Sequence, residues 1–140
     1  MTEDRIIQIQ RKLEALQTYI TRVRGYAPVT ADTLRTNVEV SGVVERNLQL
    51  ASEVVLDVAN QLIAEFRFRT PDTYKESIVI LGEAGVLQKE FADNFSGIAG
   101  FRNILVHNYM DIDYAKVADK VNNRLDDFET FAKSVAKYLQ

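Results

Sequence analysis

Residues 40–66 read VSGVVERNLQLASEVVLDVANQLIAEF, and this stretch decides the fold. Its apolar side chains recur at intervals of three and four: Val40, Val44, Leu48, Ala51, Val55, Val58, Leu62 and Phe66. Such spacing places them on one face of an α-helix, which predicts a buried apolar stripe. We expect one long helix from about Asp32 to Phe68, on the order of 50 Å at about 1.5 Å per residue. Gly42 is the expected place for this helix to bend.

The rest of the chain repeats this helical pattern, and its two prolines lie between the repeats. The pattern predicts further helices over about Thr2–Arg24, Thr73–Ala84 and Leu87–His107, and a last helix that begins at Asp111 or Asp113. Thr73 and Glu76 have the spacing of a capping box. Gly25 and Gly85 are placed to end the helices before them. Residues 1–140 are therefore predicted to form one all-α domain, an antiparallel four- to five-helix bundle.

Composition excludes several classes of protein. The chain has no cysteine and one histidine, which excludes a disulfide framework and a Cys/His zinc site, so we expect no metal and no cofactor. No apolar run approaches the roughly 20 residues that cross a bilayer, and the acidic start is unlike a signal peptide. A cytoplasmic protein is expected. The net charge of −3 provides no protein-wide basic field, so any nucleic-acid site must be local.

The segment GFRNILVHNY, residues 100–109, departs from ordinary bundle composition. On a helical projection the core side is formed by Leu87, Phe91, Asn94, Ile98, Phe101 and Leu105. His107 lies about 160° away from that side, and the residues within about 80° of it are Asn103, Ser96, Gly97 and Gly100. Glycine inside a helix costs roughly 1 kcal/mol relative to alanine. The two glycines therefore indicate close approach by another helix or a phosphate backbone, or a relief of packing inside the monomer.

This segment resembles the signature of the HEPN superfamily (higher eukaryotes and prokaryotes nucleotide-binding). The signature is an arginine, four to six residues and a histidine. Arg102, His107 and Tyr109 are similar to the variant found in the HepT toxins, which are paired with MntA-type minimal nucleotidyltransferase antitoxins. The segments 81–87 and 57–60 and the Thr70–Pro71 turn are also similar to that family, so the resemblance spans nearly the whole chain.

The resemblance implies a metal-independent endoribonuclease toxin that acts as a symmetric dimer, with two motifs facing one cleft. It implies RNA as the substrate. It further implies an MntA-like nucleotidyltransferase antitoxin as partner, which adenylylates the motif tyrosine, here Tyr109, and joins the homodimer in a larger hetero-oligomer. An added phosphate beside Arg102 would repel incoming RNA and occupy the guanidinium.

The residues themselves are compatible with this chemistry. An imidazole can exchange protons near neutral pH, and a guanidinium can hold phosphate oxygens, so His107 and Arg102 are the candidate catalytic residues. Asn103, one turn before His107, is a candidate to orient the imidazole or a phosphate oxygen. Arg102 and His107 lie about 140° apart round an ideal helix. Either the helix ends near His107 and the ring swings back, or the two residues act across the dimer; we favour the second.

Other interpretations remain open from the sequence. The chain could be a non-catalytic nucleotide-binding or regulatory partner of a nucleotidyltransferase, or a helical scaffold whose small face only dimerises. The segment Phe66–Arg69 alternates aromatic and basic residues, which suits RNA but more often marks a helix end whose arginines complement the helix dipole. We favour the helix end. Arg22 and Arg24, at the end of the first predicted helix, have the same interpretation.

Overall fold

The computed structural model describes residues 1–107 and 109–140, without the side chain of residue 109. Within these residues the fold is all-α, as predicted. The helices are α1 (Glu3–Arg24), α2 (Ala31–Thr36), α3 (Val38–Phe66), α4 (Tyr74–Glu83), α5 (Lys89–Phe95), α6 (Ile98–His107), the 3₁₀ turn η1 (Tyr109–Asp111), α7 (Tyr114–Asn123) and α8 (Leu125–Tyr138). None of the helices in this described part is long and apolar enough to cross a membrane.

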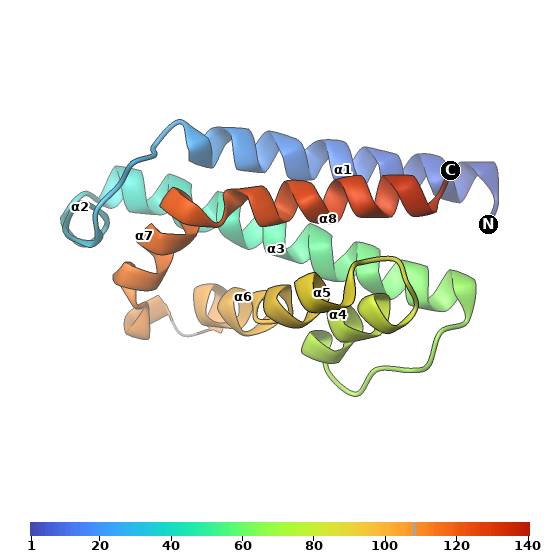
Figure 1. The fold of residues 1–140 in the computed structure, drawn as a ribbon. Helices are drawn as coiled ribbons and strands as arrows, with labels where there is room; N and C mark the ends of the chain where they lie inside the picture. The colour runs from blue at the N-terminus through green and yellow to red at the C-terminus, as the bar shows by residue number, and fades with distance from the viewer. Residues whose placement is uncertain (108) are drawn as a thin grey trace.

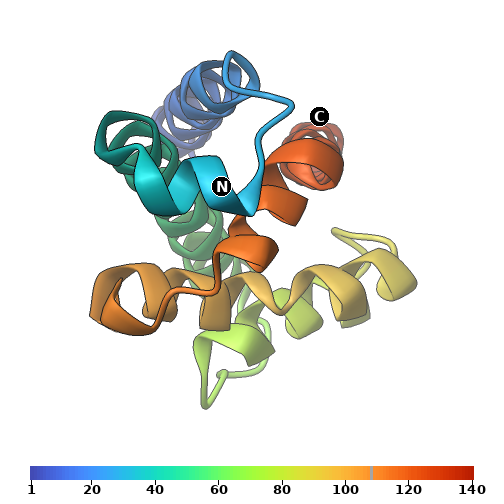
Figure 2. The ribbon, with the colours of Figure 1, turned by 90° about the vertical axis from the view of Figure 1, so that its left-hand side faces the viewer.

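The long helices form the antiparallel bundle that the pattern predicts. Helices α1, α3 and α8 lie along the long axis of the molecule, and α1 runs opposite to the other two (Figure 1). Helices α4, α5 and α6 pack together on one side of α3, and α2 contacts α7 at one end of the bundle (Figures 1 and 2). The arrangement places α6, with the candidate site residues, directly against α3 and α4.

Aromatic side chains join α5 to α8. The ring of Phe95, from α5, lies with its centroid 5.6 Å from that of Phe128 and 5.9 Å from that of Phe131, both in α8. All three side chains are buried, and aromatic pairs at this separation contribute roughly 0.5–1.5 kcal/mol beyond their burial. This contact fixes α5, and the start of α6 after it, against the core.

Three of the predicted helices are interrupted, and in each case the apolar pattern continues across the break. The expected 32–68 helix divides at Asn37, whose backbone is extended and whose side chain accepts a hydrogen bond from the amide of Val40. The bend expected at Gly42 is therefore wrong by five residues. The expected 87–107 helix divides at residues 96–97, and the last helix divides at Arg124. Asn94, expected on the core side, is exposed because α5 ends one residue later.

The predicted helix ends are otherwise confirmed. Thr2 and Gly25 cap α1, and the side chain of Thr73 accepts a hydrogen bond from the amide of Glu76 at 3.1 Å. Gly85 has a φ of +82°, the left-handed conformation that glycine adopts without strain. Asp113 caps α7 through the amides of residues 115 and 116.

Candidate functional site

Helix α6 separates a buried face from a polar one, as the projection predicts. Ile98, Phe101 and Leu105 are buried against the core. Asn103 and His107 are exposed and four residues apart, so they lie on the same outer face one turn from each other. The histidine is therefore available to a substrate, with an amide side chain beside it.

The glycines of α6 face open space. A Cβ atom built on Gly97 or Gly100 would have no described heavy atom within 4 Å, so neither glycine is required by packing within the described chain. Both line a hollow of about 500 Å³ between α6 and α7, together with Phe101, Lys116 and Lys120 among others. The open space is compatible with close approach by a second molecule, and it does not support the alternative that the glycines relieve packing inside the monomer.

Ser96 does not belong to this face, contrary to the projection. It is 1% exposed, and its hydroxyl donates a hydrogen bond to the carbonyl of Asp93 at 2.8 Å. The cause is the interruption between α5 and α6, which turns residue 96 inward as the cap of α5.

Lys120 forms one wall of the hollow beside the glycines. Its ammonium lies 5.4 Å from the centroid of the Phe101 ring, close enough for a cation–π contact. Burial lowers the pKa of the Lys120 ammonium. The hollow is therefore apolar for the most part, with a partly desolvated cation at one side.

Arg102 projects to another side of α6, into a second pocket. Its guanidinium carbon lies 5.2 Å from the centroid of the Tyr74 ring, at the start of α4. The pocket has a volume of about 470 Å³, and we call it the Arg102 pocket; it is lined by Glu53, Leu56, Asp57, Asn60, Tyr74 and Arg102. The Nε atom of Arg102 is buried and has no hydrogen-bond partner among the described residues.

Helix α3 supplies the polar wall of the Arg102 pocket. Oε1 of Glu53 accepts a hydrogen bond from Gln49 at 3.1 Å, and Oδ2 of Asp57 pairs with Lys12 at 2.7 Å. Oδ1 of Asn60 accepts a hydrogen bond from Ser77 at 2.9 Å, which ties this wall to α4. Sequence reasoning singled out the 57–60 segment but missed Glu53, although Glu53 lies one helical turn before Asp57 on the same helix face.

Within one chain Arg102 and His107 belong to different surfaces of α6. They lie five residues apart, about 140° round the helix and roughly 7.5 Å along its axis. Arg102 lines its pocket, whereas His107 is exposed and is not among the residues that line it. Helix α6 ends at His107, so the first condition is met for the alternative in which the ring swings back toward Arg102 within one chain. The side chain of Tyr109, the expected modification site, lies outside the described residues.

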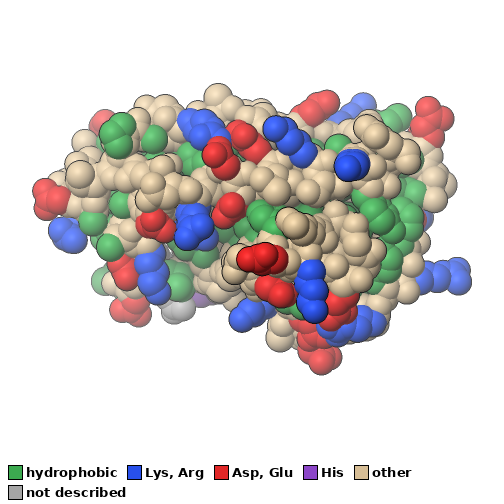
Figure 3. All heavy atoms as spheres, viewed as in Figure 1, with side chains coloured by type: hydrophobic (Ala, Val, Ile, Leu, Met, Phe, Trp, Pro, Cys, Tyr) green, Lys and Arg blue, Asp and Glu red, His purple; other side chains and the backbone are tan. Residues whose placement is uncertain are grey.

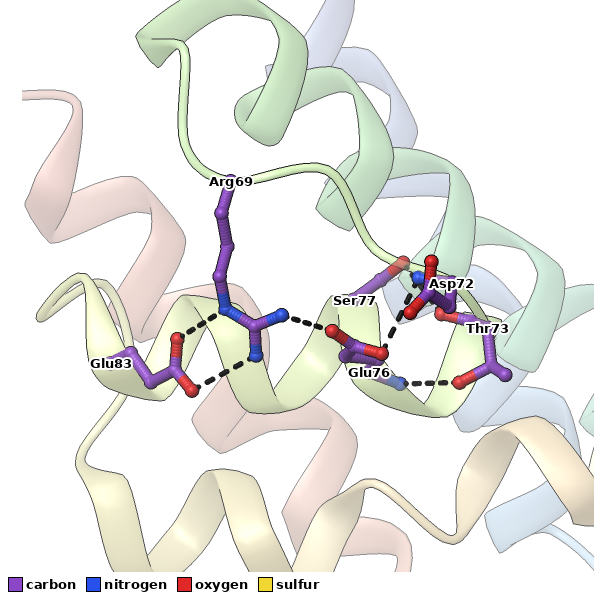
Figure 4. A network of polar contacts seen from close by, with 6 residues as sticks. All are labelled: Arg69, Asp72, Thr73, Glu76, Ser77 and Glu83. Carbon is purple, nitrogen blue, oxygen red and sulfur yellow. Dashed lines mark hydrogen bonds and ion pairs between the residues drawn. The ribbon is translucent and has the colours of Figure 1, made fainter.

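The other basic residues singled out in the sequence have structural partners. Arg67 has a φ of +55° and ends α3, while Phe66 stacks on Phe68. Arg69 pairs with Glu76 and Glu83 of α4, and we call these three residues the Arg69 cluster (Figure 4). The segment is therefore a helix end with packed phenylalanines, as preferred, but Arg69 pairs with glutamates of α4 and the last turn of α3 contains no basic residue to complement its dipole.

The two arginines at the end of α1 also have partners within the fold, as the interpretation of this segment as a helix end predicts. Arg24 pairs with Asp126 and Glu129, each at 2.7 Å. Arg22 donates a hydrogen bond to Asn47 at 3.4 Å. These contacts join the end of α1 to α8 and α3.

The charge distribution favours a local site over a broad field. Acidic and basic side chains are interspersed on the face of the molecule in Figure 3. In the part of the chain that the structure describes, no group of three or more His, Cys, Asp or Glu side chains could hold a metal ion. Helix α6 itself contributes an imidazole, a guanidinium and an amide to this region, from His107, Arg102 and Asn103.

Comparison with known proteins identifies the family. The family model for HepT-like proteins, described as ribonuclease HepT-like, matches residues 16–135. The chain belongs to the HepT-like family. The resemblance seen in the Arg102, His107 and Tyr109 motif is thereby confirmed as a family relationship.

Individual relatives agree with this HepT-like assignment. The chain is 25% identical to the "tRNA nuclease HepT" of Aphanizomenon flos-aquae, over 99% of this chain and 95% of that protein. It is 31% identical to the "mRNA nuclease HepT" of Shewanella oneidensis, over 61% of this chain and 64% of that protein. A solved tri-AMPylated HEPN toxin from Shewanella oneidensis, in complex with its MNT antitoxin, has the same fold, with a TM-score of 0.83. That structure is 24% identical in sequence, and the match covers 98% of this chain and 99% of that one.

Proposed function

We propose that this HepT-like chain is an endoribonuclease toxin of a toxin-antitoxin pair, with Arg102, His107 and Asn103 as its catalytic residues. One observation carries the proposal: α6 presents an exposed His107 and a guanidinium whose buried Nε has no hydrogen-bond partner among the described residues. Buried donors are usually satisfied within the fold, so an unpartnered guanidinium nitrogen beside a pocket supports a role in binding a ligand. The nuclease activity of the named relatives supports the same assignment.

The proposed chemistry uses these side chains without a metal. One imidazole accepts the proton of a ribose 2′-hydroxyl while the oxygen attacks the adjacent phosphorus, which forms a cyclic phosphate. A second imidazole donates a proton to the leaving 5′-oxygen. Arg102 neutralises charge that develops on the phosphoryl oxygens, and Asn103 orients the imidazole or a phosphate oxygen.

Two copies of the chain would complete the site. Each chain has one histidine, so an acid and a base of the same type require a second copy. The separation of Arg102 and His107 round α6 also supports a site made by two copies, because residues that diverge within one chain can meet across a twofold axis. The open face at Gly97 and Gly100 allows the close approach that such a dimer needs.

The proposed partner is an MntA-like nucleotidyltransferase antitoxin that adenylylates Tyr109. The solved relative is itself a tri-AMPylated toxin bound to its antitoxin, which supports this pairing. Added phosphate near Arg102 would compete with RNA for the guanidinium. Incubation with such an enzyme and ATP should add AMP to the wild type and not to Tyr109→Phe, as measured by mass.

The test compares wild type with His107→Ala and Arg102→Ala, each expressed without the antitoxin and each assayed on labelled RNA in excess chelator. Wild type alone should arrest growth and cleave RNA, with losses in the variants on the order of 10²–10⁴-fold. Unchanged melting midpoints would show that both variants fold. If all three are equally harmless and inert, the chain is instead a non-catalytic nucleotide-binding partner. If activity disappears in chelator and returns with magnesium, the metal-free mechanism is wrong.

A further inference from the structure

The Arg102 pocket has one aromatic wall. Tyr74 is 51% exposed, and the guanidinium of Arg102 lies over its ring with 5.2 Å between the guanidinium carbon and the ring centroid. Tyrosine rings and guanidinium planes both stack against the bases of single-stranded RNA. A base that enters the pocket therefore finds a stacking surface whether it meets the exposed part of the ring or the guanidinium.

The charge of the pocket disfavours a phosphate as its occupant. Two carboxylates, of Glu53 and Asp57, share the lining with a single guanidinium, and Lys12 pairs with Asp57, so these four groups together carry no net positive charge. A phosphate inside the pocket would lie beside the carboxylate of Glu53, which has no cation of its own among the described ion pairs. A neutral base would not be repelled by that carboxylate, and its phosphate could remain outside, in reach of Arg102.

The polar wall accepts hydrogen bonds more readily than it donates them. Glu53 uses Oε1 to accept from Gln49, and Asp57 uses Oδ2 to pair with Lys12. Among the described residues, the second oxygen of each carboxylate has no such partner and remains an acceptor. Guanine is the RNA base that presents two adjacent donors, N1–H and N2–H₂, on its Watson–Crick edge, whereas uracil presents one and cytosine and adenine present an amino group beside an acceptor.

The pocket is large enough for a nucleoside. Its volume of about 470 Å³ falls within the range of roughly 300–1,000 Å³ that is usual for ligand pockets. A second hollow of about 220 Å³ adjoins it, since Asn60 and Tyr74 line both. The adjoining hollow leaves room for the ribose or for a neighbouring nucleotide.

We propose that the Arg102 pocket binds an unpaired guanine base of the RNA strand, next to the phosphodiester that is cleaved. This inference rests on the proposed ribonuclease function and adds a base preference to it. Tyr74 and Arg102 stack the base, and Glu53 and Asp57 accept hydrogen bonds from its N1–H and N2–H₂ donors. The base must be unpaired, because its Watson–Crick edge is the part that is read.

The first experiment measures binding apart from cleavage. Fluorescent oligouridines with 2′-O-methyl riboses, which cannot form the 2′-oxygen nucleophile, carry one central guanine, hypoxanthine or adenine. Wild type should bind the guanine oligomer about tenfold more tightly than the other two, since hypoxanthine lacks the N2 amino group. Glu53→Gln and Asp57→Asn should remove most of this preference. Glu39→Gln, an exposed site in the first turn of the same helix, should retain it.

The second experiment measures cleavage of the matching RNA oligomers. Wild type should cleave beside guanine at least about tenfold faster than beside adenine, and Glu53→Gln should lower kcat/KM for the guanine oligomer alone. Cleavage without any base preference, with equal binding of all three oligomers, would overturn the proposal that the Arg102 pocket binds guanine. The proposed ribonuclease function would still hold. Guanine-selective binding by a chain that cleaves no RNA would overturn the ribonuclease and leave the pocket.

Discussion

Arg69 and Arg102 lie on two sides of α4, and their guanidinium groups are used in opposite ways. Nε and Nη2 of Arg69 donate to the two carboxylate oxygens of Glu83 at 2.9 and 3.0 Å, and Nη1 donates to Glu76 (Figure 4). Arg102 has the ring of Tyr74 beside it, and its buried Nε has no hydrogen-bond partner among the described residues.

The difference separates a structural arginine from one available to a ligand. A guanidinium has five donors, and in the Arg69 cluster each of its three nitrogens donates to a carboxylate of the same fold. These hydrogen bonds raise the pKa of Arg69 and lower the pKa values of Glu76 and Glu83. A buried donor without a partner costs about 1–3 kcal/mol, so its retention in the Arg102 pocket suggests a role that the folded chain alone does not reveal.

Among changes that leave the proposed catalytic residues intact, the largest effect is expected from Gly100→Leu, on the open side of α6. A Cβ atom at Gly100 meets no heavy atom of the described chain within 4 Å, and the hollow beside it has room for a longer side chain, so the variant should fold, whereas close approach by a second copy should be blocked. We expect dimer affinity and RNA cleavage to fall at least about tenfold, since overpacking at a close contact typically costs 1–3 kcal/mol. Analytical ultracentrifugation and an RNA assay measure the two losses.

Gly42→Leu is the matched control, because a Cβ at Gly42 in α3 also has no described heavy atom within 4 Å. It should leave dimerisation and cleavage unchanged. If Gly100→Leu behaves like Gly42→Leu, the open face of α6 has no role in assembly.

A smaller effect, on stability, is expected when acid protonates the glutamates of the Arg69 cluster. Because Arg69 lowers the pKa values of Glu76 and Glu83, the stability they contribute is present above their ordinary value near 4.5 and is lost as the pH falls through the lowered values. Arg69→Ala should therefore lower the melting midpoint at pH 7 and have less effect at pH 3. Thermal unfolding followed by circular dichroism checks this, and an equal loss at both pH values would contradict it.

The smallest effect is expected from Glu45→Gln in α3. Oε1 of Glu45 is also buried without a hydrogen-bond partner in the described part of the chain, but Glu45 does not line the Arg102 pocket, and burial raises the pKa of its carboxyl group. The charged form therefore costs stability at pH 7, and this cost disappears as the pH falls towards 4.5. Glu45→Gln should stabilise the chain at pH 7 by less than about 1 kcal/mol, because the carboxylate is still partly solvated, and not at pH 4.

Urea unfolding at the two pH values measures this difference, and cleavage should be unchanged. Loss of cleavage in Glu45→Gln would show that an unpartnered buried atom outside the Arg102 pocket also serves the reaction. The comparison would then no longer single out Arg102.

The helices could be predicted from the sequence, but their interruptions could not. The buried residues on either side of Arg124 keep a spacing of three and four, and the short segment before Asn37 contains a single buried residue, Leu34, so the periodicity that predicts a helix does not detect either break. Asn37 had a usable signal, since asparagine is a favoured N-cap, whereas Arg124 has none.

The features of the candidate site also divide into those that the sequence predicts and those that it does not. The exposed face of α6 with Asn103 and His107 follows from helical geometry alone. The surroundings of Arg102 do not, because Glu53 and Tyr74 reach it from α3 and α4, which are joined to α6 only by tertiary packing. Ser96 was misplaced because the projection assumed an unbroken helix.

The most direct test of the central claim measures RNA cleavage and thermal unfolding of Arg102→Ala and Arg69→Ala side by side. Arg102→Ala should lose at least about 100-fold in cleavage rate, as expected for removal of a donor to the developing phosphoryl charge, and its melting midpoint should equal or exceed that of the wild type, because an unpartnered buried donor is removed. Arg69→Ala should melt earlier and cleave normally at temperatures where it is folded. An Arg102→Ala protein that cleaves RNA at the wild-type rate would contradict the account.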